Sequence, residues 1–309
     1  MNKLMKCTVP LLLGIAVLPL FYGRPQSIQA GTPVTVNVLY PDLTPGILAY
    51  AKPVNLPKGL VLRSDRVEIT AKELENTVAK APKELQSQLN NNLVFLLEQA
   101  ATEKILLNLA KDKTKDSSIQ KDDEIIRRYL ETAVNDVKVS EEEIKIFYEN
   151  NKDMFGGASF DDIKGTLKDF VLQQKKQEAV TYFIRNLGQT ISISVAAPWI
   201  KEQAILAQDN PVDKVRASKK PSVVDFGADG CRPCDMMTPV LANLKDKYTG
   251  KLNVLFVHVQ KEQILAARYG IQVIPVQVFF DKDGKEIFRH TGFFPQNEIE
   301  KKLSEMGVK

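Results

Sequence analysis

Two of the three cysteines, Cys231 and Cys234, are separated by two residues. A short apolar run, Ser222–Phe226, precedes them and a stretch with helical spacing follows, so the pair is predicted to open a helix directly after a strand. The first sulfur would then lie near unpaired backbone N–H groups at the positive end of the helix, where the thiolate is favoured. The thiolate is the attacking species in disulfide exchange. The spacing therefore indicates Cys231 as a nucleophile and Cys234 as the thiol that resolves a mixed disulfide.

The two residues between the sulfurs suit the same chemistry. Arg232 adds a positive charge that favours the thiolate, and Pro233 stiffens the turn where a missing N–H costs nothing. A zinc site would need two further ligands, and the chain offers only His258 and His290, with no second cysteine pair. A structural disulfide would close too small a loop to stabilise much, and inert buried thiols are the third alternative. The order strand, cysteine pair, helix favours redox chemistry, for which we expect no metal and no cofactor.

The elements that must position this pair are predicted from residue 211 onward, where short apolar runs alternate with helical stretches. In chain order they are a helix over Pro211–Ala217, strand Ser222–Phe226, helix Cys231–Tyr248, strand Leu252–Val259, helix Gln263–Tyr269, strand Val276–Phe280, a turn at Asp283 and Gly284, strand Glu286–Thr291 and a final helix from Pro295. This order predicts an α/β domain over residues 211–309, a mixed sheet flanked by helices.

Length and composition place this domain in a larger chain. With 309 residues the protein exceeds the usual size of one hydrophobic core, so two domains are expected. Apolar residues make up 44% and charged residues 26%, which is the balance of a globular protein. The net charge of +4 combines 42 basic with 38 acidic residues, too even for the single-sign field on which nucleic-acid binding relies. We therefore expect no nucleic-acid partner.

The first 30 residues have the pattern of a secretory signal peptide. Lys3 and Lys6 precede an apolar run over Val9–Tyr22, and a small residue, Ala30, follows. The run is shorter than the ~20 apolar residues that a membrane-spanning helix needs. We expect export to the periplasm, with a membrane tether as the alternative if the leader stays uncleaved. Cys7 would leave with the leader.

Residues 31–196 are predicted to form a mainly helical domain with a short extended part over Pro33–Leu62, where four prolines favour strands and turns. Capping boxes start two helices, Thr70 with Glu73 and Ser140 with Glu143. Apolar stripes at helical spacing comprise Leu89, Leu93, Leu96, Leu97 and Ala100, and then Val180, Phe183, Ile184 and Leu187. A closed core and an exposed groove for client protein both remain compatible with these stripes. Residues 197–210 are predicted to be a linker.

The helical domain resembles the N-terminal chaperone region of SurA-like periplasmic folding factors over residues 62–196. The resemblance lies in Val67–Leu74, Leu96–Leu107 and Val139–Phe155. In that family a prolyl-isomerase domain of the parvulin type normally comes next. Here the sequence continues instead into segments that look like the family's returning helix and final strand, Phe160–Leu187 and Ile191–Val195. The resemblance implies a domain that lacks the parvulin insert and holds client chains without catalysis.

The last domain resembles thioredoxin over residues 211–307, on the segments Ser222–Leu241 and Tyr269–Pro275. The resemblance implies a thioredoxin fold with a redox-active disulfide between Cys231 and Cys234. It gives Asp225 the role of the buried acid that exchanges a proton with the resolving thiol. Apolar neighbours on both sides of Asp225 should place it in a low dielectric, which raises the pKa of its carboxyl group.

The same resemblance implies a client-binding surface around the cysteines. Ile274 and Pro275 match the segment whose cis-proline faces the cysteine pair and exposes backbone for an extended client. Gly292 matches the glycine that lets the client backbone approach closely. Arg232 and Pro233, between the sulfurs, complete the expected substrate-binding set.

Three positions depart from the thioredoxin pattern. Glycines, Gly227 and Gly230, replace the aromatic residues that usually flank the strand end and the first cysteine, and Phe256 stands at the position of a charged residue on the second strand. We therefore expect a barer site.

These patterns together predict an exported thiol–disulfide oxidoreductase with a client-holding helical domain. Reduction of disulfides in exported proteins is the favoured direction, fed by a membrane thiol-electron carrier. Disulfide isomerisation is the alternative, with dimerisation through the helical domain as its expected companion. A rival from another class is a holdase chaperone in which the redox domain is secondary.

Overall fold

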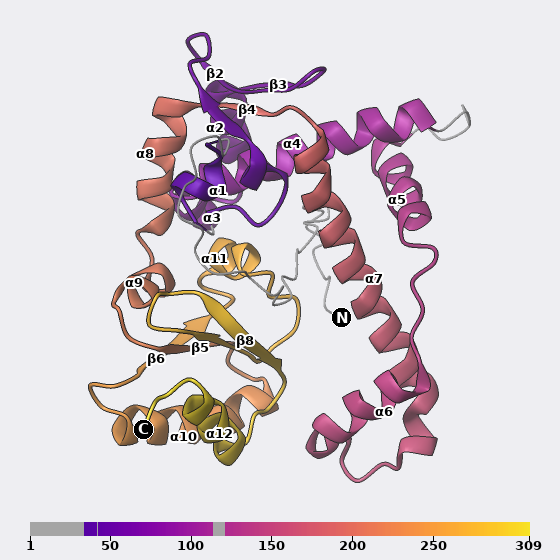
Figure 1. Ribbon diagram of the computed structural model, residues 1–309, viewed down its shortest axis with the longest axis vertical. Helices are drawn as coiled ribbons and strands as arrows, with labels where there is room; N and C mark the ends of the chain where they lie inside the picture. The colour runs from indigo at the N-terminus through magenta and orange to yellow at the C-terminus, as the bar shows by residue number, and fades with distance from the viewer. Residues whose placement is uncertain (1–33, 42, 114–120) are drawn as a thin grey trace, which may run out of the picture.

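The computed structural model describes residues 34–41, 43–113 and 121–309 (Figure 1). The predicted leader, residues 1–30, lies outside the described residues. Among the helices that the structure describes, none combines the length and apolar character needed to cross a membrane.

The first part of the chain contains a small sheet and most of the helices. Its elements are α1 (Val36–Leu39), the 3₁₀ helix η1 (Ile47–Tyr50), β1 (Lys52–Val54), β2 (Leu60–Arg63), β3 (Glu68–Thr70), α2 (Ala71–Lys80), α3 (Lys83–Asn90), α4 (Leu93–Lys113), α5 (Asp122–Ala133), α6 (Glu141–Asn150), the 3₁₀ helix η2 (Lys152–Phe155), α7 (Phe160–Thr190) and β4 (Ser194–Ala196). The strands lie in the order β1-β4-β2-β3, so β4 pairs with strands more than a hundred residues earlier and closes this unit.

The segment expected to be extended, Pro33–Leu62, also contains helical turns, α1 and η1. A buried carboxylate explains η1: the backbone N–H of Leu48 donates to Glu98 Oε1 at 3.0 Å. A Cβ on Gly46 would lie 2.7 Å from that oxygen, so a larger residue there would displace the carboxylate. Burial raises the pKa of Glu98 to about 7. A side chain from α4 thus supplies the cap that the local sequence lacks.

Of the two predicted capping boxes, one forms completely and the other in part. Ser140 and Glu143 form the complete capping box at the start of α6. At α2 only half of the expected box forms, since Thr70 accepts from the N–H of Glu73 at 3.2 Å but the Glu73 carboxylate binds Lys104 of α4 at 2.5 Å. A cation brought by tertiary packing outcompetes the local amide.

The predicted stripe from Leu89 to Ala100 is divided between two helices. Helix α3 ends at Asn90 and α4 begins at Leu93. Between them, the side chain of Asn92 donates to the carbonyl oxygen of Gln88 at 2.8 Å, which satisfies an end of α3. The apolar residues of both helices still enter one core.

Most of the predicted linker, residues 197–210, forms helix α8 (Ala197–Gln208). Ile200, Ala204 and Ala207 of α8 are buried in the first core. Their spacing of four and three places them on one helix face, so burial of that face stabilises a helix where we expected none.

The second part of the chain is a mixed sheet with helices on both faces, as expected. Its elements are α9 (Pro211–Ala217), β5 (Ser222–Gly227), α10 (Arg232–Lys247), β6 (Asn253–His258), α11 (Gln263–Arg268), β7 (Val276–Phe280), β8 (Glu286–Thr291) and α12 (Gln296–Glu305). The strand order is β6-β5-β7-β8, with β5 and β6 parallel and the other pairs antiparallel. Figure 1 shows α10 and α12 on one face of this sheet and α9 and α11 on the other.

Alternate residues of β5 serve the two faces of the sheet. Val223 joins the core under α10 and α12, whereas Val224 and Phe226 join the core under α9 and α11. Since side chains alternate along a strand, Asp225 and Gly227 lie on the α10 side with Val223. This alternation directs the acid toward the helix that begins at the cysteine pair.

Helix α11 docks the second part of the chain onto the first. Ile264 of α11 is buried in the first core, and the Gln88 side chain of α3 bonds both the carbonyl of Lys261 and the N–H of Ile264. Arg268, with 8% of its side chain exposed, donates to Ala207 O at 2.6 Å and to Asn92 Oδ1 at 3.1 Å. The two parts therefore share a buried, hydrogen-bonded contact.

We predict that Arg268→Met weakens this docking, because it removes these hydrogen bonds to the first part together with an ion pair to Asp213 of the second part. The free energy of unfolding should fall by about 2–3 kcal/mol, measured by denaturant titration. Arg127→Met, which removes an exposed pair with Glu131 on α5, is the control and should cost under ~1 kcal/mol. Equal losses in the two variants would contradict a structural role for Arg268.

Candidate functional site

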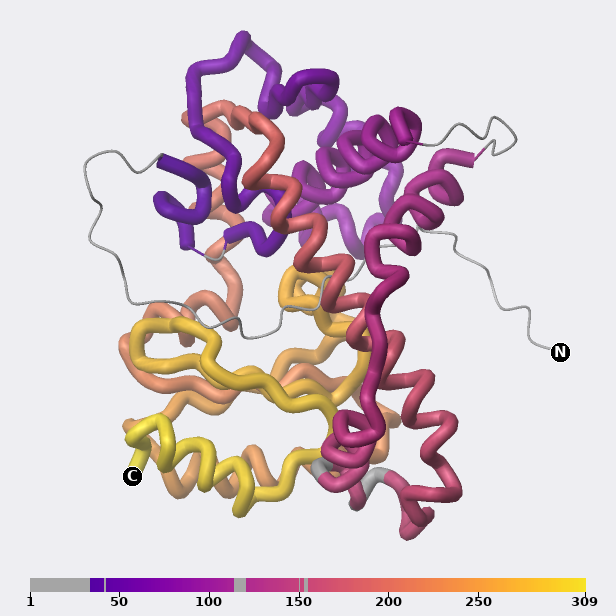
Figure 2. Tube along the Cα trace, turned by 45° about the vertical axis from the view of Figure 1, so that its right-hand side comes forward, coloured from indigo at the N-terminus to yellow at the C-terminus, as the bar shows by residue number. Residues whose placement is uncertain are grey.

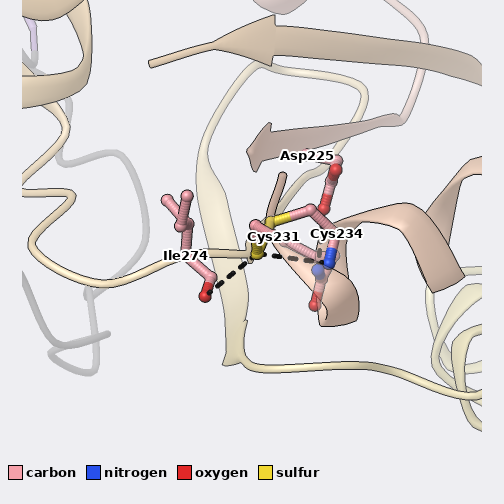
Figure 3. The surroundings of a disulfide bond; sticks show 5 residues. Asp225, Cys231, Cys234 and Ile274 are labelled. Atoms are coloured by element: carbon pink, nitrogen blue, oxygen red, sulfur yellow. Dashed lines mark hydrogen bonds between the residues drawn. A yellow bond between two sulfur atoms is a disulfide. The ribbon is translucent and has the colours of Figure 1, made fainter. Parts of the chain in front are cut away.

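The cysteine pair lies where β5 gives way to α10. Cys231 is the N-cap of α10, and its Sγ accepts the backbone N–H of Cys234 at 3.4 Å. The two residues form a disulfide with their Cα atoms 5.2 Å apart (Figure 3). Cys234 is buried, whereas Cys231 is half-buried. The sulfur of Cys231 is thus the one that a partner can reach, and the helix end that caps it would stabilise its thiolate after reduction.

The segment before β7 faces the first sulfur. The carbonyl oxygen of Ile274 lies 4.0 Å from Cys231 Sγ, and the Ile274–Pro275 peptide bond is cis. Gly292 has a φ of +101° and its N–H donates to the carbonyl of Pro275 at 2.8 Å. The Ile274 carbonyl therefore lies beside Cys231, and Gly292 is bonded to the next residue, Pro275. That these three residues contact a client stays a prediction.

Arg232 and Pro233 form the first turn of α10. Arg232 is exposed and Pro233 is half-buried. Both residues therefore lie at the start of the helix beside the disulfide, and their contact with a client stays a prediction.

Asp225 is fully buried in the middle of the second sheet, on the α10 side. Its neighbours across the strands are Phe256 and Gln277. Gln277 donates its amide N–H to Asp225 Oδ1 at 2.7 Å, and Oδ2 has no hydrogen-bond partner among the described residues. Burial raises the pKa of Asp225 to about 6, against the lowering effect of the Gln277 hydrogen bond. The direction of this pKa shift is the predicted one, and the role of Asp225 in exchanging a proton with the resolving thiol stays a prediction.

The site is not bare on the β6 side, which corrects our expectation. A Cβ added to Gly227 would lie 2.9 Å from a ring carbon of Phe256 and 3.5 Å from Cys234 Sγ. The Phe256 ring therefore fills the space that an aromatic residue at position 227 would need. The two departures compensate each other, since an aromatic ring from β6 lies beside position 227 of β5.

Gln277 is the site residue that the sequence analysis missed. It is fully buried within an apolar strand, Val276–Phe280. A polar amide in such a run was a usable signal, because a buried amide needs a partner. The antiparallel pairing of β5 with β7, which identifies Asp225 as that partner, is a tertiary fact.

The two histidines of the zinc alternative have polar partners other than the cysteines. His258 Nε2 lies 3.1 Å from an Asp229 carboxylate oxygen, and His290 Nε2 lies 3.2 Å from the carbonyl oxygen of Phe293. Within the described ranges, no group of three or more His, Cys, Asp or Glu side chains is arranged to hold a metal ion.

We predict that Gln277→Leu raises the pKa of Asp225 from about 6 to about 7 or above, because it removes a hydrogen bond that stabilises the ionised carboxylate. The carboxyl carbon shift of Asp225, followed by NMR against pH in the disulfide form, measures this. Gln263→Leu, in an exposed residue of α11, is the control. A pKa for Asp225 that stays the same or falls in Gln277→Leu would rule out this electrostatic role.

We also predict that Asp225→Asn stabilises the protein at high pH only. The folded-state pKa of about 6 lies above the unfolded value, so the contribution of Asp225 to stability is fully present below ~4 and is lost as pH rises through 6. The variant lacks this loss and should be more stable by about 3 kcal/mol at pH 8, with no difference near pH 4. Urea titrations at the two pH values measure it. A constant difference at both pH values would contradict the burial cost of the carboxylate.

Comparison with known proteins agrees with this geometry. Residues 208–307 match the family model of a thioredoxin-like domain. The chain is 39% identical over 88 residues to thioredoxin of Chlorobaculum thiosulfatiphilum, covering 28% of this chain and 81% of that protein. It is 37% identical over 78 residues to thioredoxin of Staphylococcus saprophyticus, covering 25% and 74%.

A plant relative extends the comparison. Thioredoxin Y, a chloroplastic protein of Oryza sativa, is 34% identical over 99 residues, which are 32% of this chain and 56% of that protein, so the chain spans little more than half of its length. In thioredoxin-family proteins the redox-active cysteines act directly and need no cofactor. Through its C-terminal domain, this chain belongs to the thioredoxin family of thiol–disulfide oxidoreductases.

Proposed function

We propose that the protein is an exported disulfide reductase that acts on exported proteins, with a helical domain that holds the client. The observation that carries this proposal is the position of Cys231, with its sulfur capped by the start of α10 and facing the Ile274 carbonyl at 4.0 Å. A client disulfide that approaches along this face meets the accessible sulfur first.

In the proposed reaction, the Cys231 thiolate of the reduced protein attacks one sulfur of the client disulfide. A mixed disulfide forms and the other client sulfur leaves as a thiolate. Cys234 then transfers its proton toward Asp225 and attacks the Cys231 sulfur, which releases the second client thiolate. The client gains two electrons and the protein is left with the Cys231–Cys234 disulfide, the form described here. A dithiol donor must supply two electrons for the next cycle.

We infer the compartment and the electron donor from the sequence alone. The pattern of residues 1–30 supports export to the periplasm, with a membrane tether if the leader is retained. An exported reductase needs reducing equivalents from across the membrane, which a membrane thiol-electron carrier would supply. The helical domain's resemblance to SurA-like chaperone regions supports client holding. Isomerisation, with a dimer through that domain, is the alternative use of the same site.

We predict that Cys231→Ser abolishes the reduction of insulin disulfides, because it removes the attacking sulfur, and that Cys234→Ser accumulates a mixed disulfide with the client. Turbidity of insulin and non-reducing electrophoresis measure the two effects. The matched control is Met236→Ser, an exposed residue of α10 near the site, which should keep its activity. If insulin reduction and suppression of aggregation both survive in Cys231→Ser, the redox proposal fails and the holdase chaperone takes its place.

The reduction potential of the cysteine pair tests the direction. Equilibration in glutathione buffers should give a potential near the thioredoxin value of about −270 mV. A potential near the value of about −120 mV that is typical of a strong oxidant would contradict reduction.

A further inference from the structure

A large cleft separates the second sheet from a helical arm of the first domain. We define the arm as α6, η2 and α7 up to Glu178. Residues of this arm and of the β7–β8 region line one cleft of about 1430 Å³. In both views of the molecule the arm stands beside the edge of the second sheet (Figures 1 and 2). This volume exceeds the roughly 300–1,000 Å³ of a typical small-molecule pocket.

One wall of the cleft leads to the reactive cysteine. The wall includes Val273, which has 44% of its surface exposed. The next residue along the chain is Ile274, whose carbonyl oxygen lies 4.0 Å from Cys231 Sγ. The cleft therefore borders the segment whose carbonyl oxygen faces the accessible sulfur.

The same wall contains the outermost strand of the second sheet. Four consecutive residues of β8, from Phe288 to Thr291, line the cleft. In the described sheet β8 pairs with β7 on one side and lies at the end of the strand order. An edge strand presents backbone N–H and C=O groups that an added strand can pair with, independently of the added sequence.

The opposite wall is aromatic and rich in side-chain amides. Phe147 of α6 and Phe170 of α7 line it, with their ring centroids 5.3 Å apart, and Phe170 is 39% exposed. Gln173 and Gln174 of α7 lie beside them on the wall. Aromatic faces accept apolar side chains, and amides can donate to and accept from a peptide backbone.

The arm is connected through α7 to the core on which α11 docks. Helix α7 has 31 residues and is about 46 Å long. Its far end is anchored by Val180 and Ile184 in the first core, to which the docked α11 also contributes Ile264. Near the cleft, Lys175 of α7 binds Glu143 of α6 at 2.7 Å, which ties the two helices of the arm together.

From this geometry we propose that the cleft holds an extended segment of the disulfide-bearing client, lying along the β8 edge and against Phe147 and Phe170, while its half-cystine reaches Cys231. The mixed charges of the walls, which include Glu149, Lys152, Glu178 and Arg289, favour a polypeptide of varied sequence over a ligand of one charge sign. The inference rests on the proposed function, and it makes the arm a substrate-positioning element.

Two substrates distinguish binding in the cleft from the disulfide exchange at the cysteines. The first is an unstructured synthetic peptide closed by one disulfide, and the second is the small disulfide dithiobis(nitrobenzoate), which is too short to span from Cys231 to the arm. Phe170→Glu should raise the KM for the peptide by about tenfold, since a phenyl contact is replaced by a charge. Its rate with the small disulfide should stay within about twofold of the wild type.

Tyr182→Glu is the matched control, because Tyr182 is an exposed aromatic residue of the same helix that does not line the cleft. It should leave both substrates unaffected. Equal KM values for the peptide in wild type, Phe170→Glu and Tyr182→Glu would overturn the cleft proposal. A wild type that reduces neither substrate would instead overturn the proposed function.

A cross-linking measurement keeps the inference testable if Phe170→Glu perturbs the packing of the arm. In Cys234→Ser, a peptide with a single cysteine is trapped as a mixed disulfide with Cys231. Photoreactive benzoylphenylalanine is placed at Phe170 or, as the control, at Tyr182. The trapped peptide should cross-link from position 170 and not from position 182. Cross-linking that is absent at 170, or equal at the two positions, would contradict an occupied cleft.

Discussion

The contact between the start of α10 and the sulfur of Cys231 is the interaction on which the rest of the site depends. The N–H of Cys234 points at that sulfur because Cys231 is the N-cap of the helix. Strand β5 ends at Gly227, and residues 228–230 are all that separate it from Cys231. The cap serves structure and chemistry together, since the donor that begins the helix also favours a negative charge on the sulfur.

The buried side of the site contains a carboxyl group that resists ionisation. Asp225 lies in the sheet behind the helix, where burial raises its pKa to about 6 and Gln277 limits the rise. Phe256 covers the strand end at Gly227, next to the buried sulfur of Cys234. The acid is thus held in a dry environment, where its ionisation costs stability.

The sequence predicted the second sheet and its helices almost residue by residue, because short strands between glycines and prolines leave few other choices. The helix Pro211–Ala217 and the strands Val276–Phe280 and Glu286–Thr291 have the predicted bounds. Features that depend on distant residues were not predictable in this way. The salt bridge of Glu73 with Lys104 and the packing of α8 on the first core both need contacts far along the chain.

The residues of the site also divide into those that local patterns predict and those that depend on distant contacts. Cys231, Cys234, Asp225 and Pro275 were found from local patterns and from resemblance, whereas Gln277 required the pairing of two strands. The cover of Gly227 by Phe256 required the register of a third strand, β6. The cleft beside β8 joins residues from both parts of the chain. The docking of α11, which brings the two parts together, could not be predicted from any local sequence pattern.

The most direct test of the account is the rate at which iodoacetamide alkylates Cys231 in the reduced protein, followed from pH 5 to 9 with Cys234 identified separately by mass spectrometry. If the helix start stabilises the thiolate, the alkylation rate of Cys231 should reach half of its maximum at a pH well below the ordinary cysteine pKa of about 8.5. Cys234 should react far more slowly. A midpoint for Cys231 at or above that value, or faster reaction of Cys234, would contradict the central claim.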